Sequence, residues 1–257
     1  MRKNLSLPAE AGTDAQRFVP AMLRVVFFGM DLSILDALRQ CDVNLVGVYL
    51  PPAPYRFYLD PPFWRYLLPR FLIRRHLRTA AVFAGLSAFL AEHGIEPLRA
   101  RNVNGARFRR RFVRCRPDLG IVANFGQVLG GRLLSVPKHG FINYHPSLLP
   151  KYRGPTPLGH ILLHNETVSG VTWHKVTEKL DQGDILAQEE FKVAPEDSVK
   201  DLESRAVKIA ASLLGPLLSD ISLGKEKAVP QDEALATYFS KLTRQEKQCL
   251  AAREGGM

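Results

Sequence analysis

Side chains that can move protons or donate hydrogen bonds gather in one short stretch, which reads Asn143-Tyr144-His145-Pro146-Ser147-Leu148-Leu149-Pro150-Lys151-Tyr152-Arg153-Gly154. A second polar group, Leu180-Asp181-Gln182-Gly183-Asp184, supplies carboxylates. Asn143 and His145 are two residues apart, so on an extended strand end their side chains point the same way. An amide and an imidazole on one side could present an oxyanion donor and a general base to one reacting carbon.

The elements that must position these residues alternate between strand and helix. Runs rich in Val, Ile and Phe predict strands over residues 22–28, 44–50, 119–124, 140–144, 170–176 and 185–193. Helices are predicted over residues 31–40, 80–93 and 198–214. This alternation predicts an α/β fold with a Rossmann-like, mostly parallel sheet and helices on both faces. Ligands of such folds bind at the carboxyl ends of strands, where Asn124 and Asn143 would lie.

The motif Asn-x-His-Pro-Ser-Leu-Leu-Pro-x-x-Arg-Gly, with Leu-Asp-x-Gly-Asp downstream, resembles the 10-formyltetrahydrofolate-dependent formyltransferases. That family includes enzymes that formylate glycinamide ribonucleotide, methionyl-tRNA and nucleotide-linked amino sugars. The resemblance spans roughly residues 23–224, and it is dense over residues 117–186 and sparse over residues 50–116. A long motif with a partner in the expected place is a far more specific signal than a single glycine pattern.

The resemblance implies a catalytic role for three residues. His145 would handle the proton, since an imidazole titrates near neutral pH. Asn143 would polarise the formyl carbonyl through its amide, and Asp181 would orient His145 and favour its protonated form. Without the resemblance, His145 would be interpreted as a hydrogen-bonded core histidine and Asn143 as an asparagine that bonds loop backbone. Asp181, like Asp184, would be interpreted as a turn residue.

Further residues are implied to surround the reacting groups. The loop that would hold the pterin ring of the folate through its backbone consists of Asn124, Phe125, Gly126, Gln127, Val128 and Leu129. Ser147 lies on a loop that would border the site, and Arg153-Gly154 would fix that loop by hydrogen bonding. Thr172 and His174 match a strand whose side chains support the site, although packing explains them nearly as well.

Composition limits the class of protein. The chain of 257 residues is 46% apolar, which fits a globular protein with a real core. The cysteines, Cys41, Cys115 and Cys249, are far apart, which fits a reducing cytoplasm and argues against a disulfide framework and a structural zinc site. We therefore expect a cytoplasmic enzyme and assign no metal. Residues 1–20 do not read as a signal peptide, and no run of eighteen apolar residues suggests a transmembrane segment.

The net charge of +10 is concentrated in two blocks of arginines, at residues 56–78 and 99–116. Each block could be a solvated helix face, or the two together could bind an anionic partner. The first block lies in a segment, residues 51–78, where arginines alternate with aromatic residues. Such a segment could bind the acceptor by stacking on it, could form a small subdomain with its own core, or could contact a membrane.

The predicted organisation is a flexible segment over residues 1–20, a formyltransferase domain over residues 21–224 and a C-terminal extension over residues 225–257. Residues 236–243 resemble the segment that leads into a C-terminal barrel in methionyl-tRNA formyltransferases, for which we expect no room here. The predicted function is therefore transfer of the formyl group of 10-formyltetrahydrofolate to a primary amine on an anionic acceptor.

A nucleotide-linked amino sugar is the first choice of acceptor, methionyl-tRNA the second and a small amine the third. The rival interpretations are a formyltetrahydrofolate hydrolase and an inactive folate- or RNA-binding homologue. A homodimer is left open.

Overall fold

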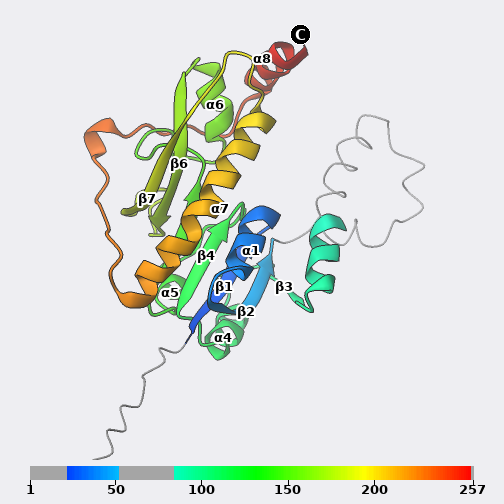
Figure 1. Ribbon diagram of the computed structural model, residues 1–257, viewed down its shortest axis with the longest axis vertical. Coiled ribbons are helices and arrows are strands. Elements are labelled where there is room, and N and C mark those ends of the chain that lie inside the picture. Colours follow the sequence, from blue (N-terminus) through cyan, green and yellow to red (C-terminus); the bar gives the residue numbers. More distant parts are fainter. Residues whose placement is uncertain (1–21, 52–83, 256–257) are drawn as a thin grey trace, which may run out of the picture.

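The computed structural model describes residues 22–51 and 84–255, and within them the chain forms one seven-stranded sheet with helices on both faces (Figure 1). The strand order is β3-β2-β1-β4-β5-β6-β7. Pairing is parallel from β3 to β5 and antiparallel from β5 to β7. The predicted α/β class, with a mostly parallel Rossmann-like sheet, is confirmed. The predicted segment 1–20 and most of the insert 51–78 lie outside the described residues.

The strands are β1 (Leu23–Gly29), β2 (Val43–Leu50), β3 (Pro97–Arg99), β4 (Leu119–Ala123), β5 (Phe141–His145), β6 (Val168–Lys175) and β7 (Ile185–Lys192). The helices are α1 (Leu32–Arg39), residues 84–92, α4 (Ala106–Arg114), α5 (Gly131–Leu134), α6 (Pro157–Leu163), α7 (Val199–Leu223) and α8 (Arg244–Gly255), with a 3-10 turn at Glu233–Leu235. All six predicted strands are present with ends shifted by one or two residues. Helix α7 ends nine residues later than predicted, because Pro216 is accommodated inside it.

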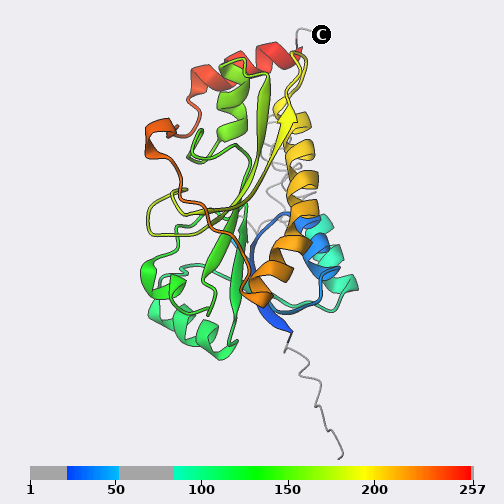
Figure 2. The same cartoon turned by 60° about the vertical axis from the view of Figure 1, so that its left-hand side comes forward.

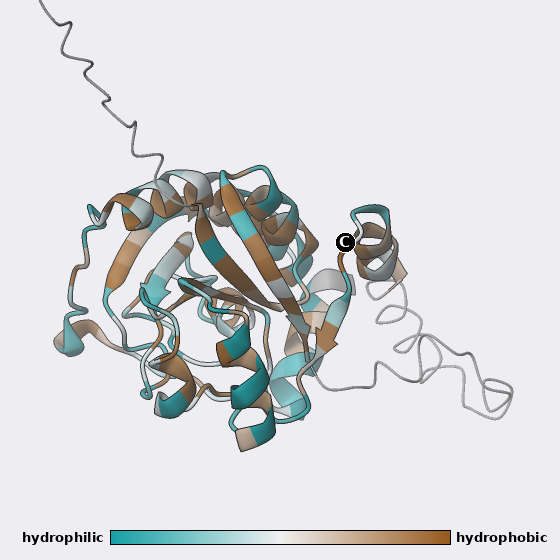
Figure 3. Cartoon of the chain, turned by 90° about the horizontal axis from the view of Figure 1, so that it is seen from below, coloured by the Kyte–Doolittle hydropathy of each residue, from teal (hydrophilic) through white to brown (hydrophobic). Residues whose placement is uncertain are grey.

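The sheet separates two apolar layers, which Figure 3 shows as brown strands between amphipathic helices. On one face, α1, α6 and α7 pack over residues such as Phe27, Ile121 and Trp173. On the other face, α4 and α5 pack over an aromatic cluster in which Phe28 stacks on Tyr49 with ring centroids 4.7 Å apart. Successive side chains of a strand point to opposite faces. Phe141, Asn143 and His145 of β5 therefore share the face that carries the aromatic cluster.

Helix α7 is long and apolar enough to cross a membrane by length and composition alone, although charged residues interrupt its apolar sequence. In the fold it is a core helix. Leu202, Ala206 and Leu214 are fully buried, and the indole of Trp173 in β6 donates a hydrogen bond to the Ala210 carbonyl at 3.0 Å. Its start is fixed by the predicted capping pair, since Ser198 and Asp201 bond each other's backbone N–H groups.

The segment after Gly224 lies against the domain (Figures 1 and 2). It pairs briefly with β7 through Val229 and Ile185, passes the Arg153 backbone at residues 237–239, and continues into α8 beside α6. Arg253 of α8 donates hydrogen bonds to the carbonyls of Leu162 and Pro195. Residues 225–255 thus belong to the same packed body as the strands.

Candidate active site

Four polar side chains converge at the carboxyl end of β5, namely Asn143, His145, His174 and Asp181. The amide nitrogen of Asn143 lies 3.0 Å from Nε2 of His174. The carboxylate oxygen Oδ1 of Asp181 lies 3.8 Å from Nδ1 of His145 and 3.8 Å from Nε2 of His174. His145, His174 and Asp181 are all buried, so their mutual interactions are screened little by water.

The register of the antiparallel β5–β6 pair brings these residues together. Asn143 lies directly opposite His174, and His145 directly opposite Thr172. Opposed residues of a pair point to the same face of the sheet. The intervening pair, Tyr144 and Trp173, points to the opposite layer, where both side chains are buried in the core. Along these two strands, residues of the site therefore alternate with residues that pack in the α7 layer.

The hydrogen bonds of His174 show which of its two ring nitrogens carries the proton. The side-chain nitrogen of Asn143 can only donate, so Nε2 of His174 accepts from it. The proton must then lie on Nδ1, which donates to the Lys175 carbonyl at 2.8 Å. Burial is the main cause that lowers the pKa of His174 from its usual value to about 4, with repulsion from His145 as the next cause. His174 is thus neutral at physiological pH and holds the Asn143 amide in one orientation.

His145 is anchored from the other side. Its Nε2 donates to the Tyr152 carbonyl at 2.9 Å, which leaves Nδ1 facing the carboxylate of Asp181. The separation of 3.8 Å is longer than a direct hydrogen bond. Because Nε2 is occupied by the Tyr152 carbonyl, Nδ1 is the atom of this imidazole that is suited to exchange a proton.

Asp181 is held by the backbone around it. Its Oδ2 accepts a hydrogen bond from the Gly154 N–H at 2.9 Å, and its own backbone adopts the left-handed region with φ of 54°. Gly183, two residues on, packs so closely on the Lys175 carbonyl that a Cβ there would overlap it. The tight turn and the Gly154 contact together point the carboxylate toward the two imidazoles.

Ser147 and Thr172 hold the loop that follows β5. Thr172 donates to the Ser147 carbonyl at 2.6 Å and accepts from the Leu149 N–H at 3.1 Å, while the Ser147 hydroxyl donates to the Lys151 carbonyl at 2.8 Å. Both residues are fully buried. These hydrogen bonds fix the path of the loop, so Ser147 and Thr172 support the site by holding its backbone.

The loop of residues 124–129 is braced from one side and exposed on the other. The Gln127 side chain donates to the Ala100 carbonyl at 2.6 Å and accepts from the Val103 N–H at 3.3 Å. Leu129 is buried, whereas Val128 is 62% exposed and Gly126 faces open space. Beyond the loop, Glu178 accepts a hydrogen bond from the Gly131 N–H at 2.9 Å, which ties the loop to the segment that carries Asp181. At its start, the Asn124 amide lies 3.4 Å from the Asp31 carboxylate.

Arg153 and Gly154 anchor the loop after β5 by hydrogen bonding, as expected, but their partners lie far along the chain. The Arg153 side chain donates to the Gln231 amide oxygen at 2.8 Å and to the Glu233 carboxylate at 2.8 Å, both in the C-terminal segment. The Gln231 amide nitrogen in turn donates to the carbonyls of Asp181 and Gly183, at 2.9 and 2.7 Å. Gln231 thus connects Arg153 to the turn that carries Asp181. Sequence reasoning missed it, because no local pattern marks a contact across fifty residues.

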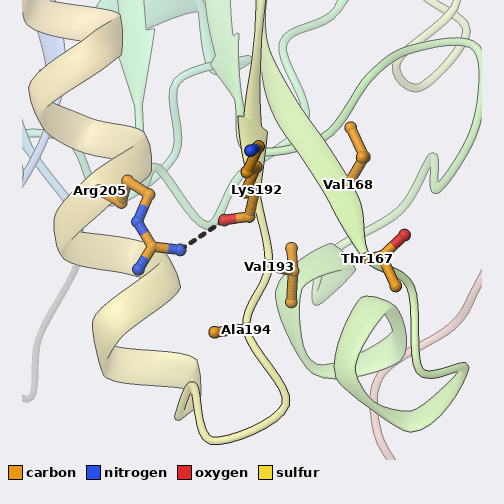
Figure 4. Close-up of a pocket in the computed structure, with 6 residues that line it drawn as sticks. All are labelled: Thr167, Val168, Lys192, Val193, Ala194 and Arg205. Atoms are coloured by element: carbon orange, nitrogen blue, oxygen red, sulfur yellow. Dashed lines mark hydrogen bonds between the residues drawn. The ribbon is translucent and has the colours of Figure 1, made fainter.

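Two cavities of the described residues lie away from the four polar side chains of the site. One of about 690 Å³ lies between the end of β7 and α7, where Arg205 donates to the Lys192 carbonyl (Figure 4). A second, of about 700 Å³, lies beside α4. In the part of the chain that the structure describes, no group of three or more His, Cys, Asp or Glu side chains could hold a metal ion.

Comparison with known proteins gives the fold and the site a family. Residues 78–215 match the family described as Formyl transferase. The chain is 37% identical over 164 residues to methionyl-tRNA formyltransferase of Halalkalibacterium halodurans, covering 64% of this chain and 52% of that protein. It is 30% identical over 227 residues to the enzyme of Thermotoga maritima, covering 87% of this chain and 66% of that protein. The chain thus spans between half and two thirds of the length of these relatives.

Among solved structures, an N-formyltransferase from Helicobacter canadensis, in complex with folinic acid and dTDP-3-aminofucose, superimposes with a TM-score of 0.59. It is 18% identical, and the match covers 88% of this chain and 72% of that one. This likeness concerns the fold. The match over residues 78–215 takes in more than half of the chain and includes every residue of the polar cluster at the end of β5. The chain therefore belongs to the formyl transferase family.

Proposed function

We propose that this protein is an N-formyltransferase that takes the formyl group from 10-formyltetrahydrofolate and passes it to a primary amine. The observation that carries the proposal is the arrangement of Asn143, His145, His174 and Asp181 at the end of β5. It places an amide donor beside a proton-exchanging imidazole, which is what acyl transfer to an amine requires. Membership of the formyl transferase family supports the same chemistry.

The loops beside the site fit a folate. A pterin is flat and carries donors and acceptors along one edge, so it needs exposed backbone groups and apolar walls. The loop of residues 124–129 offers the unobstructed backbone of Gly126 and the exposed side chain of Val128. Across the link from Gly131 to Glu178, the segment that leads to Asp181 offers Leu180, which is 43% exposed. Both Val128 and Leu180 are large apolar side chains that the fold leaves exposed.

The donor, when bound, supplies an activated formyl group. Asn143 would bind and orient the formyl oxygen with the amide hydrogen that it does not donate to His174. His145 would take the proton of the attacking amine at Nδ1, and Asp181 would stabilise the resulting imidazolium. His145 would then return this proton to the folate nitrogen as the bond between that nitrogen and the formyl carbon breaks. His174, held neutral, would keep the Asn143 amide from rotating and would not compete for the proton.

For the acceptor, a nucleotide-linked amino sugar remains our first candidate, and the ligand of the Helicobacter canadensis neighbour is of that kind. The second candidate is methionyl-tRNA, which the names and the 30–37% identity of the curated relatives favour. The excess of lysine and arginine together over acidic residues suits either anionic acceptor.

The test is a formyl-transfer assay with 10-formyltetrahydrofolate and three acceptors: a dTDP-amino sugar, methionyl-tRNA and a small amine. We expect tetrahydrofolate to form with only one of the three acceptors. Mass spectrometry should then detect the formylated form of that acceptor. Release of formate without any amine would identify a hydrolase instead. Donor binding without turnover in any of these assays would identify a binding protein.

A further inference from the structure

The cavity beside α4 is lined by several arginines together with aromatic and apolar residues. It measures about 700 Å³, and its wall includes Arg101, Arg107, Arg111 and Arg114, with Tyr49 and Phe108 among its apolar residues. A volume of this order suits a small organic ligand. We call it the arginine cavity.

The arginines form a row because of helical spacing. Arg107, Arg111 and Arg114 are separated by four and three residues, so they lie on one flank of α4, while Phe112 turns into the core. Residues 97–117 contain eight arginines and no aspartate or glutamate. Among the described residues, none of the arginines of the cavity forms an ion pair. Like charges at this spacing destabilise a helix, which an anion between them would reverse.

The arginine cavity is separate from the candidate active site. It lies beside β2 and β3, at one edge of the sheet, whereas Asn143 and His145 lie on β5. Three strand spacings divide β2 from β5 and four divide β3 from β5, which amounts to about 14 to 19 Å. A ligand in the cavity therefore does not share the positions of the reacting groups.

We propose that the arginine cavity binds a small phosphorylated molecule with a flat or apolar part, of the nucleoside polyphosphate kind. Guanidinium groups bind phosphate oxygens in pairs of parallel hydrogen bonds, and a row of them suits consecutive phosphates. Phe108 is half-buried and Leu98 lies on the cavity wall, so both offer apolar surface to a ring. A bare inorganic anion would use the arginines and leave this apolar surface unmatched.

The site is connected to the loop of residues 124–129. Arg101 and Asn102, which line the cavity, belong to the segment whose backbone Gln127 grips at Ala100 and Val103. Asn104 of the same segment donates to the Val128 carbonyl at 2.9 Å and accepts from the Gly130 N–H at 2.8 Å. A ligand that orders this segment would therefore change the affinity of the neighbouring loop for its own ligand, and the effect would be reciprocal. This coupling rests on the proposed function, whereas the binding itself does not.

The experiment measures binding of ATP and of pyrophosphate to the full chain by calorimetry, without folate present. Wild type should bind ATP more tightly than pyrophosphate, and added salt should weaken both. The variant R107A/R111A should lose about tenfold or more of its ATP affinity. The variant R109A/R110A removes the same charge from α4 outside the cavity lining, so it should change the affinity by less than about threefold.

Equal losses in the two double variants would show diffuse attraction by charge and would overturn the site. Pyrophosphate that binds as tightly as ATP would overturn the role given to the apolar surface. Single-stranded RNA that binds far more tightly than ATP, and is lost in R107A/R111A, would replace the small molecule by a nucleic acid.

Coupling is tested separately by measuring the affinity for 5-formyltetrahydrofolate with and without saturating ATP. We expect a change in wild type that Asn104→Ala reduces. ATP binding with an unchanged folate affinity would overturn only the coupling, and ATP binding without any folate binding would count against the proposed function instead.

Discussion

The side-chain amide of Asn143 donates a hydrogen bond to Nε2 of His174 across the β5–β6 pair, over 3.0 Å. The bond uses one of the two amide hydrogens and leaves the second free. Because His174 is itself fixed by the Lys175 carbonyl, the free hydrogen has a defined direction. A donor that needs no reorientation during the reaction is the kind that stabilises developing negative charge best.

Replacing Asn143 with Ala should therefore lower kcat about a hundredfold or more, because an oxyanion contact is strongest in the transition state. Steady-state kinetics with the accepted amine would measure it. A change confined to KM would remove Asn143 from this role.

His145→Ala should lose a similar factor, about a hundredfold or more, because Nδ1 of His145 is the atom placed to exchange the proton. The melting temperature serves as the control, since the Ala variant also loses the bond to the Tyr152 carbonyl. Wild-type turnover in a folded variant would show that this imidazole is only a packed side chain.

Asp181→Asn separates the charge of Asp181 from its structural bond. The amide oxygen of Asn can still accept from the Gly154 N–H, so the turn should keep its conformation. Loss of the negative charge should lower kcat about tenfold or more, while the Kd for folate changes little. A variant with full activity would make Asp181 a turn residue, and one that loses folate binding would place it in the donor site.

His174 should give the stability a dependence on pH. Its pKa is about 4 in the folded protein and near 6.5 when unfolded, so the unfolded chain binds the proton more readily. Stability should therefore fall as pH drops from about 6.5 to about 4, by up to about 1.4 kcal/mol per pH unit.

Urea unfolding of His174→Gln across this range should show a flatter dependence than wild type. The variant His139→Gln, outside the site, should keep the wild-type slope. Equal slopes in wild type and His174→Gln would contradict the assignment of His174 as a buried neutral group.

Gln231→Ala should impair catalysis from outside the motif, because Gln231 holds the carbonyls of Asp181 and Gly183. We expect kcat to fall about tenfold, because the Asp181 carboxylate would no longer be held in one orientation. The matched control is Glu233→Gln, which also contacts Arg153 but is exposed and does not touch the Asp181 turn. If both variants lower only the melting temperature, Gln231 is a structural link without influence on the reaction.

The strands could be predicted because buried parallel strands are continuous apolar runs, as in the residues of β1 and β4. Strand β3 was missed, since Pro97–Arg99 is too short to show a period. Helix α4 was missed as an element because its arginines mask the apolar pair Phe108 and Phe112, although the arginine block itself was recognised. Helix α6 was also not predicted, because it is short and contains Gly159, although Pro157 at its first position is typical of a helix start.

The site was predictable to the extent that it is local. The spacing of Asn143 and His145 gave their common side, because the strand period is two. The contact between Asn143 and His174 was not predictable, since it depends on the register of two strands thirty-one residues apart. The roles of Gln231 and Arg153 depend on how the C-terminal segment docks, which no pattern within that segment reveals.

The antiparallel β5–β6 pair has a consequence for how this chain can change over time. The register of the two strands places each reacting group, so a change of length within either strand displaces several groups at once. Deleting one residue from β6 before His174 would turn Trp173 toward the reacting groups and the imidazole into the α7 layer. The connection between the strands, which contains α6, can vary in sequence without this penalty as long as the register is kept. We expect insertions to be tolerated in that connection and excluded from the strands themselves.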